Sequence, residues 1–230
     1  MLAFRNVALW FIALLLITVV GFWPTYFRQL PSGPHLTHHL HGITMLLWML
    51  LLITQALWVR THRIALHRRL GRVSLVLAPL VVLSGIVVTL HNIRSVPDPT
   101  GRFMLGLYAF GWFLSLSFGL LWGLAMVHRR DVQLHARYMI TTALVLLFPG
   151  FYRALSLAGE ALDLPVPGFY DAQYLIGAAG LALIVWDLRR GRVRAPFVVF
   201  TGLWALNLLL WKVLPDLDAW RRFTVWSAAL

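Results

Sequence analysis

The feature that most constrains this chain is a series of apolar stretches that contain no charged residue. A helix of about 20 mostly apolar residues crosses the hydrocarbon core of a bilayer. Seven stretches are candidates for such helices, and the first four of them are the longest. They cover residues 6–27, 42–59, 73–90, 103–127, 138–152, 172–186 and 195–211. The sequence therefore predicts an all-α polytopic membrane bundle of about seven transmembrane helices.

The composition excludes a soluble domain. Hydrophobic residues make up 60% of the chain and charged residues only 12%, whereas soluble domains average about 45–50% and about 25%. The connections between the stretches are short, so residues 1–230 are expected to form one transmembrane domain embedded in the lipid bilayer. The 20 basic residues outnumber the 8 acidic ones. Because they lie in short runs between apolar stretches, they indicate membrane orientation and not a nucleic-acid partner.

The distribution of basic residues predicts which helix ends face the cytoplasm. If the amino terminus lies inside and the stretches alternate in direction, thirteen Lys and Arg residues fall in inner segments and seven in outer ones. Cytoplasmic segments are enriched in Lys and Arg, so we expect a cytoplasmic amino terminus and an outer carboxyl terminus. The aromatic tail after Pro215 is expected to lie at the membrane interface.

Two absences narrow the possible chemistry. The chain has no cysteine, which excludes disulfides, thiolate metal sites, iron–sulfur clusters and covalently attached haem. No Asp or Glu lies within an apolar stretch, which argues against carboxylate ion pathways and di-iron sites. Lys212 lies at the outer end of the last stretch without an interior carboxylate as counter-ion, so a retinal Schiff base is disfavoured.

Nine histidines remain as candidates for chemistry, and all lie between residues 35 and 135. They sort to opposite ends of the predicted helices. The outer ones are His35, His38, His39, His41 and His91, and the inner ones are His62, His67, His128 and His135. His67 and His91 are 24 residues apart, which is about 36 Å along a helix. A histidine-ligated centre is therefore expected near one surface, within the second to fifth stretches.

The outer histidines are dense enough for a metal site. In the run His35-Leu-Thr-His38-His39-Leu-His41, residues 35, 38 and 39 share one helical face. Imidazoles suit copper or zinc, so His35, His38 and His39 are candidate metal ligands. His41 and His91 are candidate axial ligands of an outer haem. The alternative is a polar interfacial segment without a ligand.

Two polar stripes predict a seam inside the bundle. On the second stretch, residues recur every seven positions: His41, Trp48, Gln55 and His62. On the fifth, a second stripe follows helical steps: His135, Tyr138, Thr142, Pro149 and Arg153. If the stripes face each other, they line an interior seam; otherwise these residues only fix helix packing.

The inner motif His67-Arg-Arg-Leu-Gly-Arg72 has the components of a haem site. Imidazole supplies an axial bond, glycine admits a flat macrocycle, and arginine pairs with propionates. His135 is the candidate for the opposite axial ligand, and Arg72 and Arg153 are candidate propionate partners. The same residues equally fit a basic cytoplasmic anchor with an interfacial histidine.

These residues together carry a resemblance. A group of uncharacterised bacterial multi-pass membrane proteins shares a pattern that this chain resembles over residues 38–153. The matching segments are His41-Gly-Ile-Thr-Met-Leu-Leu-Trp48, Gln55, the motif at 67–72, His135-Ala-Arg-Tyr-Met139 and Arg153. The resemblance implies a bacterial inner-membrane protein but no particular activity. A looser similarity is to cytochrome b561-type proteins, which hold haems between histidines of a four-helix core, whereas here the histidines sit at span ends.

These observations leave three functional hypotheses. The leading one is a membrane protein that binds haem b, or copper or zinc instead, and acts in electron transfer. The second is a non-enzymatic subunit or assembly factor of a larger membrane complex, with other membrane subunits as partners. The third is a metal-dependent hydrolase or transporter that uses the outer cluster. Hydrolysis lacks a nearby carboxylate as general base, and the His-x-x-x-His of the seventh span in hydrolases related to adiponectin receptors is absent.

Overall fold

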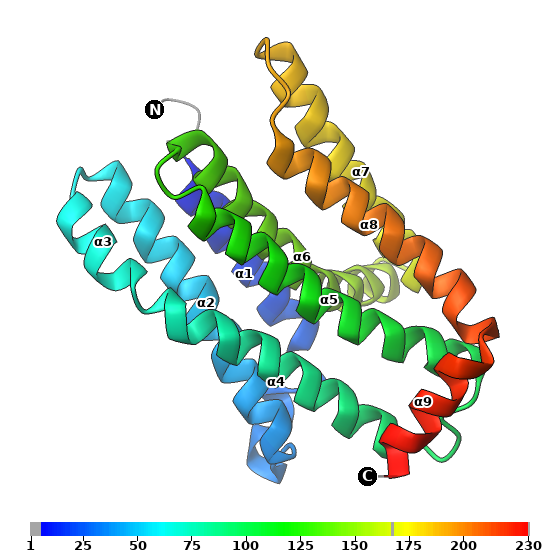
Figure 1. Ribbon diagram of the computed structural model, residues 1–230. Helices are drawn as coiled ribbons and strands as arrows, with labels where there is room; N and C mark the ends of the chain where they lie inside the picture. Colours follow the sequence, from blue (N-terminus) through cyan, green and yellow to red (C-terminus); the bar gives the residue numbers. More distant parts are fainter. Residues whose placement is uncertain (1–5, 167, 230) are drawn as a thin grey trace.

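The computed structural model describes residues 6–166 and 168–229, and these are almost entirely helical (Figure 1). The helices are α1 (Val7–Phe22), α2 (Leu36–Arg60), α3 (Ile64–Gly71), α4 (Ser74–Arg94), α5 (Arg102–Val127), α6 (Val132–Ala161), α7 (Phe169–Arg189), α8 (Ala195–Val213) and α9 (Asp218–Ala229). Two 3-10 turns, η2 (Phe27–Ser32) and η3 (Leu214–Asp216), connect α1 to α2 and α8 to α9.

Six helices in the described part of the chain are long and apolar enough to cross a membrane: α2, α4, α5, α6, α7 and α8. The architecture is that of a multi-pass membrane protein, as the uncharged stretches predict. α1 is apolar but has only 16 residues, about 24 Å of helix. The seventh crossing therefore remains a prediction.

The first and fifth stretches differ from the helices that they predict. The first helix ends at Phe22 and not at residue 27, because Pro24 has no amide hydrogen to continue the helical bonding. The fifth is a 30-residue helix, α6, which continues past Arg153 to Ala161 with Pro149 inside it. Asp131 caps its start by accepting hydrogen bonds from the Gln133 and Leu134 amides, which lower the pKa of its carboxyl.

The helices pack as neighbours in a consistent order. α2 lies against α4, α4 against α5, and α5 against α6, while α1 covers α6 and α2 and the α7–α8 pair covers α5 and α6. The backbones of α1 and α6 touch, because a Cβ added at Gly21 would overlap the carbonyl oxygen of Gly150. A Cβ added at Gly150 would lie 2.7 Å from Thr18 Cα. These glycines therefore allow α1 and α6 to approach closely.

The interior seam expected from the two stripes exists at its centre. Trp48 of α2 is fully buried, and its Nε1 donates a hydrogen bond to Thr142 Oγ1 of α6 at 3.3 Å. The Trp48 ring also contacts Phe118 of α5 edge-on, with ring centroids 4.9 Å apart. Gln55, the next stripe residue, is buried as well. These contacts tie α2, α5 and α6 around one core.

The bundle has two chemically different ends. The arginine-rich end consists of the end of α2, α3, the α5–α6 turn and the α7–α8 turn, and it holds the predicted inner histidines. The opposite end holds the start of α2, the end of α4 and helix α9. α9 packs across α5 through a hydrogen bond from Trp220 Nε1 to the Leu105 carbonyl at 3.1 Å.

Candidate haem and metal sites

Two histidines meet at the arginine-rich end. His67 lies on the short helix α3 and His135 in the first turn of α6. Their ring centroids are 6.4 Å apart and their ring planes are perpendicular. α3 brings His67 to this position because it folds back against the end of α2 before the chain enters α4 (Figure 1). The structure thus brings together the two inner ligands that the sequence predicts.

The tautomer of the neutral His135 ring is set by a backbone contact. Its Nδ1 lies 2.9 Å from the carbonyl oxygen of Ala125, which can only accept, so Nδ1 carries the hydrogen. In this tautomer Nε2 carries the lone pair. Ligating histidines typically donate their second ring nitrogen to such an outer acceptor, which fixes the ring's tautomer and orientation.

Several polar atoms around His67 are buried without a partner. They are the Nδ1 of His67 and both the Oε1 and Nε2 atoms of Gln55. Unpaired buried polar groups are rare in native proteins and call for an explanation such as a ligand. Burial, followed by the nearby His135, lowers the pKa of His67 and favours the neutral imidazole, which is the form that binds a metal.

The dimensions fit a haem held by two imidazoles. The His67 and His135 ring centroids are 6.4 Å apart, a separation at which two imidazoles could hold one haem iron between them. A Cβ added at Gly71 would meet only Gln55 Nε2, at 3.9 Å, so packing within the protein does not require glycine there.

The two predicted propionate partners lie in different places. Arg72 ends α3 directly after Gly71 and is exposed. Arg153 lies 18 residues beyond His135 on α6, about 27 Å away along the helix. Its guanidinium stacks over the Phe22 ring at 4.6 Å and donates to the Pro149 carbonyl. Only Arg72 is near enough to serve the inner pair.

A second histidine group lies at the opposite end of the bundle. One ring nitrogen each from His35, His38 and His91 lies within 4.8 Å of the other two. The rings of His35 and His91 are stacked, with centroids 4.0 Å apart, and His38 meets His91 edge-on at 5.2 Å. The start of α2 and the end of α4 supply these residues because the two helices are antiparallel neighbours.

The other outer histidines face different partners. His39 Nδ1 lies 2.8 Å from the Tyr26 hydroxyl, and His41 Nδ1 lies 3.2 Å from Ser84 Oγ. Ser84 precedes His91 by seven residues, about 10 Å along α4. The structure therefore groups His91 with His35 and His38. His39 lies outside this group, and His41 does not meet His91.

A buried ion pair that the sequence pattern does not predict joins α6 to α7. Arg137 of α6 and Asp187 of α7 lie at the arginine-rich end, with side chains 4% and 1% exposed and their Nη2 and Oδ1 atoms 2.7 Å apart. In the sequence, Asp187 directly follows the sixth uncharged stretch and Arg137 directly precedes the fifth. The available signal was that Asp187 is one of only eight acidic residues in the chain.

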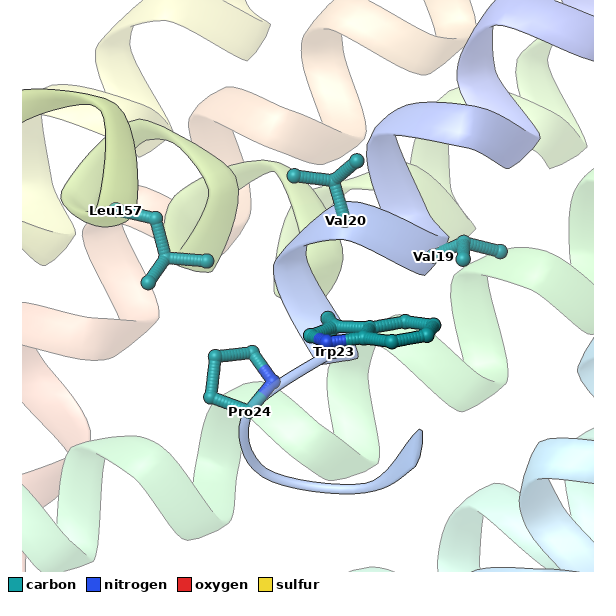
Figure 2. Close-up of a pocket in the computed structure, with 5 residues that line it drawn as sticks. All are labelled: Val19, Val20, Trp23, Pro24 and Leu157. Atoms are coloured by element: carbon teal, nitrogen blue, oxygen red, sulfur yellow. The ribbon is translucent and has the colours of Figure 1, made fainter. Parts of the chain in front are cut away.

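A hollow of about 270 Å³ lies between the end of α1 and α6. Figure 2 shows its apolar lining, with Trp23 and Pro24 at the end of α1 and Leu157 on α6. Apart from the indole nitrogen of Trp23, the side chains around it carry no polar atom, and their character suits contact with acyl chains.

No family model matches the chain, and neither the curated proteins nor the solved structures contain a significant match.

Proposed function

We propose that the protein is a haem b-binding membrane protein that acts in electron transfer, with His67 and His135 as the axial ligands. The observation that carries the proposal is the pairing of these rings at 6.4 Å. Bound haem would supply one-electron chemistry through its iron. His135 is oriented by the Ala125 carbonyl, and Arg72 would provide a cation for a propionate.

The test is the difference spectrum between dithionite-reduced and oxidised protein, purified in mild detergent from cells supplied with haem. We expect a Soret shift with sharp α and β bands. His67→Ala and His135→Ala should each remove these bands, because a six-coordinate haem needs both imidazoles.

The matched control is His62→Asn. His62 lies at the same end of the bundle but is exposed, with a φ of 59° that asparagine tolerates. Its variant should keep the full spectrum. A featureless spectrum from the folded, haem-supplied protein would refute the proposal. Stoichiometric co-purification of other membrane proteins with such colourless protein would instead support the role of a complex subunit.

We also propose that the arginine-rich end faces the cytoplasm of a bacterial inner membrane. Because the chain lacks cysteine, single introduced cysteines report on sidedness without background. A membrane-impermeant maleimide should label Leu164→Cys, in the α6–α7 connection, on intact cells. It should label Arg192→Cys, in the α7–α8 turn, only after lysis, and the reverse pattern would invert the orientation.

A further inference from the structure

We propose that His35, His38 and His91 form a site for one divalent transition-metal ion, copper or zinc, at the opposite end of the bundle from the His67–His135 pair. This site is independent of the haem proposal, since it uses other residues at the other surface. It differs from the metal site predicted from the sequence, because His91 of α4 takes the place of His39.

The three donor atoms are already close to a metal-binding arrangement. They lie within 4.8 Å of one another, whereas a tetrahedral ion with bonds of about 2 Å holds its donors about 3.3 Å apart. His35 precedes the first residue of α2 and His91 lies in the last turn of α4. Small side-chain rotations at these helix ends are sufficient to close the difference.

His38 has a buried ring nitrogen whose lone pair is available to a metal ion. Its Nε2 lies 3.0 Å from Asn92 Oδ1, which acts as the acceptor when the amide is oriented as placed. Its Nδ1 then carries the lone pair, and this atom is buried without any hydrogen-bond partner. Asn92, the neighbour of His91 in sequence, therefore acts as a positioning residue that holds the His38 ring beside His91.

The contacts of His35 allow it to join the site. Its Nδ1 lies 3.0 Å from Thr37 Oγ1. This Nδ1 also accepts a hydrogen bond from the Thr37 amide at 3.3 Å, which caps α2. Binding an ion through Nε2 therefore requires the ring hydrogen to move to Nδ1, where Thr37 Oγ1 can accept it. The His35 and His91 rings are stacked with their centroids 4.0 Å apart, so the two imidazoles lie side by side, within reach of one ion.

The donor set selects the kind of ion. Three imidazoles with no carboxylate or thiolate in the group suit copper and zinc, whereas magnesium and calcium require oxygen ligands. His35 is exposed, so water can reach the ion and complete its coordination.

The experiment is metal titration of chelator-stripped protein, purified through a tag that contains no histidine. Zn²⁺ and Cu²⁺ are titrated separately against a competing chelator, and the Cu²⁺ sample is read by electron paramagnetic resonance for imidazole nitrogen couplings. We expect one equivalent of at least one ion. His38→Ala and His91→Ala should each weaken binding by more than about 100-fold, and Asn92→Leu by about 10–100-fold.

The matched control is His39→Gln, which alters a neighbouring histidine outside the group and should leave the affinity within about threefold. The size-exclusion profile and the helicity of each variant show whether it is folded. If an alanine variant does not fold, Asn92→Leu still tests the site, because it keeps all three histidines. The proposal is overturned if wild-type protein binds neither ion stoichiometrically, or if binding survives His38→Ala and His91→Ala. The readout is bound metal and not haem absorbance, so this proposal and the haem proposal fail separately.

Discussion

Replacing Asp187 with leucine is expected to destabilise the protein by about 3–5 kcal/mol, because Arg137 would remain charged and buried without its partner. The Arg137 guanidinium donates to both Asp187 oxygens, through Nε at 3.1 and 3.2 Å and Nη2 at 2.7 Å. Asp187 Oδ2 also accepts from the Arg194 amide at 3.2 Å. One carboxylate thus connects α6, α7 and the α7–α8 turn. The loss is measured by unfolding in mixed micelles.

The double variant Arg137→Leu/Asp187→Leu separates charge from packing. With neither charge present, no buried ion is left uncompensated, so the double variant should be more stable than Asp187→Leu alone. Equal or greater instability in the double variant would show that the contacts of these side chains matter more than their charges.

Gly150→Ala is expected to cost about 1–3 kcal/mol, although alanine favours helices more than glycine does. The new methyl would lie 2.7 Å from Thr18 Cα, and the backbone of α1 can yield only by moving away from α6. In an Ala8→Cys background, thiol labelling of this buried position should accelerate as α1 separates.

Gly202→Ala is the matched control within α8, where an added Cβ has no neighbour within 4 Å. There the same substitution should stabilise the protein by about 0.5–1 kcal/mol. Equal effects at the two glycines would mean that the α1–α6 contact does not depend on backbone approach.

The existence of the six long helices could be predicted from the uncharged apolar stretches, but the positions of the helix ends depend on tertiary contacts. Arg137 and Arg153 bound the fifth uncharged stretch on either side in the sequence, yet both lie inside α6. Arg137 is neutralised by a residue 50 positions away, and Arg153 stacks on Phe22 of α1. The sequence around Arg137 and Arg153 therefore does not reveal either of these partners.

The candidate sites, too, could be predicted from the sequence only in part. The inner pair was predictable, because His67 and His135 both fall at helix ends on one side of the membrane. The outer group was only partly predictable. His35 is the cap of α2, with ψ of 148°, so the helical wheel did not apply to it. His38 and His39 are consecutive and point in different directions, and only the packing of α4 shows which one meets His91.

The order of the two histidine groups along the chain has a consequence for biogenesis. The outer group is complete once residue 91 has entered the membrane, because α2 and α4 alone supply it. The inner pair also needs α6 and the Ala125 carbonyl of α5. A nascent chain arrested after α4 can therefore already assemble the outer group, whereas the pairing of His67 with His135 must wait until α6 has been inserted.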